Sequence, residues 1–322
     1  MTAAAATRPL SPADLDAAVE IDGAAAGRSR RGFFAKRLAL LAEDPEAGLA
    51  LGAERDGRLL GFAFARLVDG EFGGTTRAGV LDALAVSEAA RGAGVGSALL
   101  ASLTDALGAR GARQLLTQAD WSEHQLVGFF AASGFRLSGR FVLERGLERP
   151  AGEDFAWEDL PVRSMDERDA QAIVRLDRRI TGRDRAAYYR RKIAETLRHA
   201  GVRVSLVAEV DGAFAGFLMA RVDYGDFGRT EPTAVLDTVG VHPDFARRHV
   251  GRALVEQLVL NLGSLRVERI LTEVGWDQLD LLAFFARTGF GPSQHLSFER
   301  PIGASPPSGG GARGARSSRI VV

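Results

Sequence analysis

The sequence predicts an α+β fold that is repeated within one chain. An offset of 155 positions brings the two halves of the 322 residues into register without a gap and carries Asp82 onto Asp237. Each half then shows the same succession of patterns, an antiparallel hairpin followed by strand, helix, strand, helix and strand. Because this period is longer than that of a solenoid repeat, we expect two whole domains, each a mixed, mostly antiparallel sheet flanked by helices.

The repeat sets the expected domain boundaries. Segments that coincide at this offset include Val80-Leu81-Asp82 with Val235-Leu236-Asp237, Gly61-Phe62 with Gly216-Phe217, and Phe129-Phe130-Ala131 with Phe284-Phe285-Ala286. We expect a first domain over residues 1–150, a second over 151–302, and a junction at Ala151–Glu158. Residues 303–322 are rich in glycine, serine and proline, a composition typical of a disordered tail.

Apolar spacing predicts the elements of each half in order. Three- and four-residue spacing indicates two helices before the hairpin, and Asp-Gly pairs indicate its tight turn. In the first half we expect helices at Pro12–Ile21, Phe33–Leu41 and Glu123–Ser133, and strands at Leu49–Glu54, Leu59–Arg66, Val80–Val86, Gln114–Ala119 and Arg136–Glu144. In the second half we expect helices at Glu167–Leu176, Tyr188–Leu197 and Gln278–Thr288, and strands at Val204–Val210, Phe214–Arg221, Arg269–Val274 and His295–Arg300.

Composition excludes several classes of function. Lysine and arginine together number 41, as do aspartate and glutamate, so the chain lacks the basic excess of a protein that mainly binds nucleic acid or an anionic membrane. Without cysteine there is no disulfide, thiolate metal site or cysteine nucleophile. The histidines show no metal-ligand spacing, no apolar run approaches the roughly 18 residues of a membrane span, and the start lacks a signal-peptide profile. We therefore expect a cytoplasmic protein without a metal.

The stretch Val80–Leu100 carries the clearest functional signal. The apolar strand Val80–Val86 leads into Arg91-Gly92-Ala93-Gly94-Val95-Gly96, and a helix with leucines along one face follows. Glycines let the backbone approach a ligand, and the start of a helix offers unpaired N–H groups and the positive end of its dipole. The spacing is neither a dinucleotide fingerprint nor a Walker loop, because it lacks the distant acidic residue of the first and the Gly-Lys-Ser/Thr of the second. The pattern predicts a diphosphate site.

This turn resembles motif A of the GNAT superfamily, the acetyl-CoA-dependent N-acyltransferases. Arg91, Gly94 and Gly96 occupy the fixed positions of the Arg/Gln-x-x-Gly-x-Gly/Ala pattern. The segment Phe129–Phe135 is similar to the helix of motif B, in the same order and at a similar spacing. The resemblance covers nearly all of each half, and it implies two tandem GNAT-like acyl-CoA N-acyltransferase domains.

The resemblance also implies how a cofactor binds. In such proteins the turn binds the pyrophosphate of coenzyme A, and the strand before it splays from its neighbour. We therefore expect acetyl-CoA as the cofactor, with its pantetheine arm on the backbone of Leu84 and Val86. The residues expected to bind it are Leu84, Ala85, Val86, Arg91, Gly92, Ala93, Gly94, Val95, Gly96 and Ser97.

Asp82 and its repeat Asp237 are the candidate catalytic residues. Asp82 is the one acid on the strand before the glycine turn, and alternation along the strand directs it toward the cleft, as for the usual base of the family. Amide formation requires an uncharged amine, so a general base would accept the proton of the ammonium group. Alternatively, the aspartate pairs with an arginine such as Arg66 or Arg221 and only orders the sheet.

The chain departs from the family pattern at two places. Where family members often have a tyrosine general acid, this chain has Phe130 and Phe285, so either the thiolate leaves unaided or another donor acts, with Tyr224 a candidate in the second copy only. The second turn has Arg247 and His249 where the first has glycines. We expect the first half to bind acetyl-CoA and the second to bind it weakly or not at all.

Candidate acceptor-binding residues fall in two loops. Arg28 and Arg30 lie between the first two helices, which in such proteins often border the acceptor cleft, and are expected to bind an anionic acceptor. Glu71 and Phe72 precede the signature strand and are further candidates for the pocket wall. In the alternative interpretation, the arginines are solvated or join the two halves, and Phe72 packs a turn.

Together these patterns predict an N-acetyltransferase that moves an acetyl group from acetyl-CoA to a primary amine of a small molecule or peptide. A second hypothesis is a non-catalytic acyl-CoA-binding sensor or scaffold, which the missing tyrosine favours and the intact first turn opposes. Transfer of longer acyl chains is a third. The expected partner is the amine acceptor, with no nucleic acid and no membrane, and the expected state is a monomer or homodimer.

Overall fold

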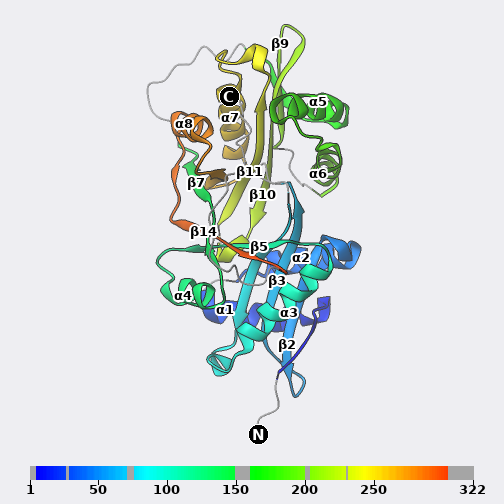
Figure 1. Cartoon of the computed structure of the whole chain (residues 1–322), viewed down its shortest axis with the longest axis vertical. Coiled ribbons are helices and arrows are strands. Elements are labelled where there is room, and N and C mark those ends of the chain that lie inside the picture. The colour runs from blue at the N-terminus through cyan, green and yellow to red at the C-terminus, as the bar shows by residue number, and fades with distance from the viewer. Residues whose placement is uncertain are drawn as a thin grey trace.

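The computed structural model describes residues 5–26, 29–70, 76–148, 160–199, 204–229 and 231–303. These residues form two mixed sheets of seven strands each, flanked by helices. Figure 1 shows one sheet with its helices at each end of an elongated molecule. We call the residues up to 148 the N-half and those from 160 the C-half. The predicted α+β class in two tandem copies is confirmed.

The N-half follows the predicted order and adds a short strand at its start. Its elements are β1 (Ala6–Pro9), α1 (Leu15–Ala26), α2 (Arg31–Glu43), β2 (Gly48–Arg55), β3 (Arg58–Asp69), β4 (Arg77–Val86), α3 (Val95–Ala109), β5 (Gln114–Asp120), α4 (His124–Ala132), β6 (Arg136–Leu137) and β7 (Arg140–Gly146). The added strand β1 pairs antiparallel with β2 at the sheet edge, where its terminal proline leaves no central ladder bond missing.

The C-half repeats this order. Its elements are β8 (Val162–Ser164), α5 (Ala170–Thr181), α6 (Ala186–His199), β9 (Leu206–Val210), β10 (Ala213–Tyr224), β11 (Pro232–Val241), α7 (Val250–Gly263), β12 (Arg269–Gly275), α8 (Leu279–Arg287), β13 (Gly291–Pro292) and β14 (His295–Pro301). The single strand predicted over Arg136–Glu144 is wrong. The chain there forms β6 and β7, which belong to different sheets. The amide of Ser138 donates to the carbonyl of Ser297, and after this residue the chain crosses to the C-half.

The two halves exchange their last long strands. The sheet of the N-half has the order β1-β2-β3-β4-β5-β14-β6, and that of the C-half has the order β13-β7-β12-β11-β10-β9-β8. Seven residues of β14 pair antiparallel with β5, and seven residues of β7 pair antiparallel with β12. In Figure 1, β14 runs from the C-half down to β5, and β7 lies among the strands of the C-half. Each sheet therefore contains a strand from the other half.

A buried ion pair fastens β7 to the C-half. The guanidinium of Arg145 donates to both carboxylate oxygens of Glu256 on α7, at 2.9 and 3.0 Å, and its side chain is only 5% exposed. The repeat offset places Arg300 and Ala101 at the equivalent positions, so the N-half has no counterpart of this pair. Such a buried pair contributes little net stability, since both charges lose their hydration.

Apolar layers hold the central strands of the N-half from both faces. Leucines of α3, including Leu99 and Leu103, pack on one face of the sheet and are fully buried. On the other face, Phe34 of α2 contacts Phe62 and Phe64 of β3. Because β4 lies between these layers, its backbone has a fixed position on which a site can be built.

The exchange predicts that the halves remain associated after the chain is cut. A site-specific protease sequence inserted between residues 149 and 159 breaks the covalent link without altering any described strand. Because β7 and β14 each lie within the sheet of the other half, the fragments should co-elute at the mass of the intact chain and separate only in denaturant. Size-exclusion chromatography with mass detection measures this, and separation in native buffer would contradict the exchanged topology.

Candidate active site

The candidate site begins where β4 and β5 part. The two strands pair in parallel over only three residues each, Ala78–Val80 with Gln114–Leu116. Beyond this point β4 continues along β3, and β5 continues along β14. We call the region beyond the last pair, between the continuing strands, the fork. In the C-half the equivalent strands β11 and β12 also pair over only three residues, Thr233–Val235 with Arg269–Leu271.

A β-bulge in β4 marks the start of the fork. Leu81 pairs with Ala65 and Ala83 pairs with Phe64, so Asp82 is the extra residue on β4. Bulges commonly occur beside active sites, where they redirect a side chain. The hydroxyl of Thr117 on β5 donates to the carbonyl of Leu81 at 3.0 Å, so this carbonyl has a hydrogen-bond partner although the strands have parted. Asp237 and Thr272 repeat this arrangement in the C-half, with a distance of 2.9 Å.

The backbone of Leu84 and Val86 faces the fork. The amide of Ser87 donates to the carbonyl of Leu60 at 2.8 Å, which makes these two a hydrogen-bonded pair of the antiparallel ladder. Hydrogen-bonded pairs alternate with non-hydrogen-bonded pairs along an antiparallel ladder, and Leu84 and Val86 fall in non-hydrogen-bonded pairs with β3. Their backbone N–H and C=O groups therefore point away from β3. They point to the side on which β5 has diverged.

The glycine turn lies at the surface, at the start of α3. Gly92 and Gly94 have φ values of 75° and 78°, and Gly94 is the N-cap residue of the helix. A Cβ atom at either glycine would meet nothing within 4 Å, so the backbone conformation rather than crowding requires glycine here. The turn and the first residues of α3 therefore present helix-start amides to solvent, an arrangement suited to an anion.

The equivalent turn of the C-half adopts the same backbone conformation without glycines. Arg247 and His249 have φ values of 62° and 60°, and His249 is the N-cap residue of α7. A non-glycine residue in this left-handed region costs about 1–2 kcal/mol. The turn is thus strained, and it carries side chains where the first turn has none.

The carboxylate of Asp82 lies in a buried network of arginines. Its side chain is 1% exposed, and Arg66 Nε lies 3.0 and 2.9 Å from the two carboxylate oxygens. Arg37 of α2 lies 3.3 Å away and also binds Asp226 of the C-half at 2.7 Å. The sequence left open an ion pair of Asp82 with Arg66, and the structure contains it. In the C-half, Asp237 pairs with Arg221 and, at 3.0 Å, with Lys192.

Of the predicted acceptor-binding residues, the described part of the chain includes Arg30. Arg30 is buried, binds Asp22 at 2.9 Å through Nε, and donates to the carbonyl of Gly225 in the C-half at 2.6 Å. Its repeat Arg185 binds Asp177 and the carbonyl of Gly70 in the N-half. Both arginines therefore connect the halves. Arg28, Glu71 and Phe72 lie outside the described residues.

Neither motif B phenylalanine contacts solvent. Phe130 and Phe285 are 2% and 1% exposed and pack against the rings of Phe135 and Phe290 respectively. Tyr224, the predicted candidate for a general acid in the C-half, is 53% exposed at the end of β10. Neither motif B position therefore provides a hydroxyl that could act as a proton donor.

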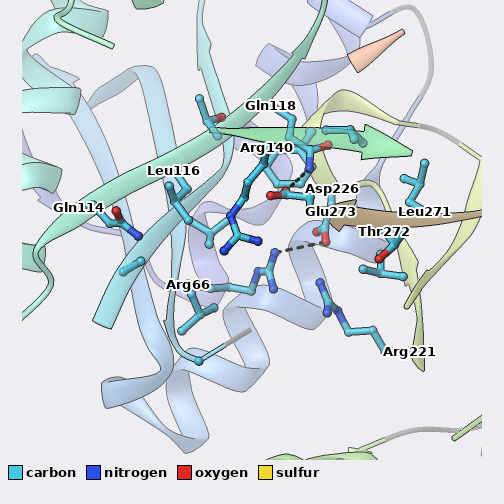
Figure 2. Close-up of a pocket in the computed structure, with 18 of the residues that line it drawn as sticks. Arg66, Gln114, Leu116, Gln118, Arg140, Arg221, Asp226, Leu271, Thr272 and Glu273 are labelled. Atoms are coloured by element: carbon cyan, nitrogen blue, oxygen red, sulfur yellow. Dashed lines mark hydrogen bonds and ion pairs between the residues drawn. The ribbon is translucent and has the colours of Figure 1, made fainter. Parts of the chain in front are cut away.

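A cavity of about 70 Å³ lies between the halves. One water molecule needs at least about 10–15 Å³, so the cavity has room for several waters or a small polar group. Figure 2 shows Arg66, Arg140 and Arg221 with their guanidinium groups directed into the same part of this cavity. A polar chain crosses it nearby, since Arg229 donates to Gln118 at 2.7 Å and Gln118 to Glu273 at 2.6 Å. Burial lowers the pKa of Arg229 to about 10.

Some of these residues could have been found in the sequence. Thr117 and Thr272 coincide at the repeat offset, as do the cations Arg37 and Lys192, so the repeat itself marks them. Arg140 has no such signal, because its repeat position is His295. Its place in the cavity depends on the strand exchange.

The described residues contain neither a membrane-spanning helix nor a metal cluster. No described helix is both long and apolar enough to cross a membrane. Within the same ranges, no group of three or more histidine, aspartate or glutamate side chains is arranged to hold a metal ion.

Comparison with known protein families gives a match in each half. Residues 18–135 and residues 170–290 match the model described as the Acetyltransferase (GNAT) family. The two matched segments together span most of both halves. A search of curated proteins returned no match.

Three solved structures share the fold over nearly the whole chain. A tandem GNAT protein from the clavulanic acid biosynthesis pathway is 18% identical, with a TM-score of 0.64 over 94% of this chain and 100% of that chain. A GCN5-related N-acetyltransferase from Sphaerobacter thermophilus is 16% identical, with a TM-score of 0.63 over 92% and 96%. A GCN5-related glucosamine N-acetyltransferase region of a fungal multi-domain GH3 beta-N-acetylglucosaminidase is 16% identical, with a TM-score of 0.65 over 93% of this chain but only 38% of that chain. At these identities the similarity establishes the fold alone.

His295 at the start of β14 predicts a pH-dependent stability. Burial, followed by the nearby charge of Arg229, lowers the pKa of His295 from 6.5 to about 4. Between pH 6.5 and 4 the unfolded chain therefore binds a proton that the folded chain does not, so stability falls as the pH falls.

Replacing His295 by glutamine removes this effect. Between pH 7.5 and pH 4.5 the wild type should lose about 2 kcal/mol more of its free energy of unfolding than the His295→Gln variant loses. Urea unfolding at the two pH values measures the difference. Parallel losses in the two proteins would show that His295 titrates normally in the fold.

Proposed function

Because the chain belongs to the Acetyltransferase (GNAT) family, we propose that it is an N-acetyltransferase that moves an acetyl group from acetyl-CoA to a primary amine of a small molecule or peptide. The proposal assigns donor binding to the N-half and includes a cytoplasmic location, where coenzyme A thioesters are available. Members of this family generally use acyl-CoA, and the N-half offers the residues for such a donor.

The main support is the glycine turn beside the fork. The positive φ values of Gly92 and Gly94 bring the start of α3 to the surface without a side chain in the way, which suits a diphosphate. The backbone groups of Leu84 and Val86 face the fork and suit the amides of a pantetheine arm. The turn of the C-half carries the side chains of Arg247 and His249 where the first turn has glycines. The C-half is therefore the weaker donor site in this proposal.

The remaining roles belong to the backbone at the fork and to the carboxylate of Asp82. Bound acetyl-CoA supplies an activated acetyl thioester. The backbone of Leu84 and Val86 would orient the donor, and amide donors at the fork would polarise a carbonyl placed there. In this proposal Asp82 accepts the proton of the incoming amine, and Arg66 and Arg37 hold its carboxylate in place. The amine nitrogen would bond to the acetyl carbon as the C–S bond of the thioester breaks, and the sulfur would depart as a thiolate without a tyrosine donor.

A non-catalytic acyl-CoA sensor or scaffold is the second candidate. The observation in its favour is that Phe130 and Phe285 are buried hydrocarbons at the positions where the family often has a proton donor. Free-thiol release from acetyl-CoA across a panel of amines separates the two candidates, because a binding protein releases no thiol.

Coenzyme A should bind at one strong site in each chain. Isothermal titration calorimetry should give a stoichiometry near one. Gly94→Val should weaken binding by about tenfold or more, because a β-branched residue is strained at a φ of 78°. The matched change His249→Gly in the other turn should leave the affinity of the strong site unchanged. Two equal sites, or a Gly94→Val variant with normal affinity, would refute donor binding by the N-half alone.

Asp82→Asn tests the proton acceptor. If Asp82 is the base, kcat/KM should fall by about a hundredfold or more and lose the pH dependence that the acid introduces. The affinity for coenzyme A should remain within about twofold, which also reports correct folding. Asp105→Asn, at an exposed position of α3, is the matched control. An unchanged pH–rate profile in Asp82→Asn would remove Asp82 as the base and leave it a structural partner of Arg66.

A further inference from the structure

We infer that the cavity between the halves binds the acceptor, and that the acceptor is a small amine that also carries an oxyanion group, either a carboxylate or a phosphate. This inference rests on the proposed function and specifies its substrate class. It assigns the oxyanion to arginines from both halves.

The cavity lies where an acceptor must approach. Val80 and Leu116, the last paired residues before the fork, line the cavity together with Thr117. Their repeats Val235 and Leu271 line it from the C-half. The cavity therefore adjoins the point where β4 and β5 part, and a group held in it lies beside the inner end of the fork.

The charge of the cavity favours an oxyanion. Among its described lining residues, Arg66, Arg140, Arg221 and Arg229 outnumber the carboxylates Asp226 and Glu273. Figure 2 shows three of the guanidinium groups directed toward a common space. Asp82 and Asp237 pair with Arg66 and Arg221 behind the lining, but Arg37 and Lys192 share these two carboxylates, so positive charge stays in excess. A carboxylate or phosphate placed among the arginines would reduce that excess. Guanidinium groups also match the planar geometry of these anions.

Neighbouring carboxylates fix the positions of two of these arginines. Asp82 holds Arg66 and Asp237 holds Arg221, each from the bulge of its own half. An arginine already positioned in this way loses less conformational entropy when it binds an anion. Asp226 lies 3.6 Å from Arg66 and binds Arg37, and Glu273 accepts a hydrogen bond from Gln118, so these two carboxylates also hold side chains of the lining in place.

The C-half has a function in this inference even without a strong donor site. It supplies Arg221, Arg229, Asp226 and Glu273 to the lining, while the exchanged strand β7 supplies Arg140. The acceptor site is then composite, and neither half forms it alone. The volume of about 70 Å³ limits the enclosed part of the acceptor to a small head group.

The first experiment compares matched acceptors by thiol release from acetyl-CoA. The pairs are ethanolamine with O-phosphoethanolamine, and glycinamide with glycine, so each pair differs by one oxyanion group. In the wild type the anionic member of at least one pair should have the higher kcat/KM, and the better pair distinguishes phosphate from carboxylate.

Two variants locate the effect in the cavity. Arg140→Gln and Arg221→Gln should each lower kcat/KM for the anionic amine by about tenfold or more through KM, because a charge-assisted hydrogen bond is lost. The same variants should leave the affinity for coenzyme A unchanged, which also shows that they are folded. Arg136→Gln is the control, since that side chain is 68% exposed on β6. A preference for the neutral amines, or variants with no effect, would overturn the inference and leave the proposed acetyltransferase standing.

A binding experiment decides the matter if no amine is acetylated. With coenzyme A at saturation to occupy the turn, calorimetry measures the binding of inorganic phosphate and of glycine to the wild type and to Arg140→Gln. Binding that weakens in the variant supports the anion site even if the proposed enzyme activity fails. Absence of binding, or equal binding to both proteins, overturns the inference.

Discussion

The site depends on the parting of β4 from β5 after only three paired residues. Both strands remain fixed because each keeps another partner: β3 on one side, and β14 from the other half on the other. The bulge at Asp82 lies where the sheet opens, and there the hydroxyl of Thr117 donates a hydrogen bond to the carbonyl of Leu81, which has lost its strand partner. Backbone groups beyond that point face the fork and are suited to bind a ligand.

The same region joins the two halves. Asp226 of the C-half binds Arg37 of the N-half beside Asp82, so one side chain from the C-half belongs to the electrostatic surroundings of the site in the N-half. The exchanged strands reinforce this link, because β5 pairs with β14 of the other half beyond the point where it leaves β4. Duplication has therefore produced one interdependent unit. The two turns have diverged within it, since His249 replaces Gly94 and adopts the same left-handed backbone conformation with a side chain present.

Local patterns predicted the parts of the fold that depend on local sequence. Apolar periodicity and the 155-residue repeat predicted the helices and the hairpins, and the glycine spacing predicted the turn. Alternation of side chains along the strand marked Asp82 as a candidate. The exchange could not be predicted, because the repeat makes β7 and β14 similar in sequence and neither strand alone indicates which sheet it joins. The place of Arg140 in the cavity follows from that exchange, and the contact of Arg37 with Asp226 follows from how the two halves meet, so both required the tertiary structure.

Hydrogen–deuterium exchange with and without coenzyme A tests the central claim most directly, because it reports on the backbone amides that the fork and the turn are said to offer. Bound coenzyme A should slow exchange at Leu84, at Val86 and over residues 92–96, with little change at the equivalent positions 239, 241 and 247–251. Equal protection in both halves, or none at the fork of the N-half, would contradict the account.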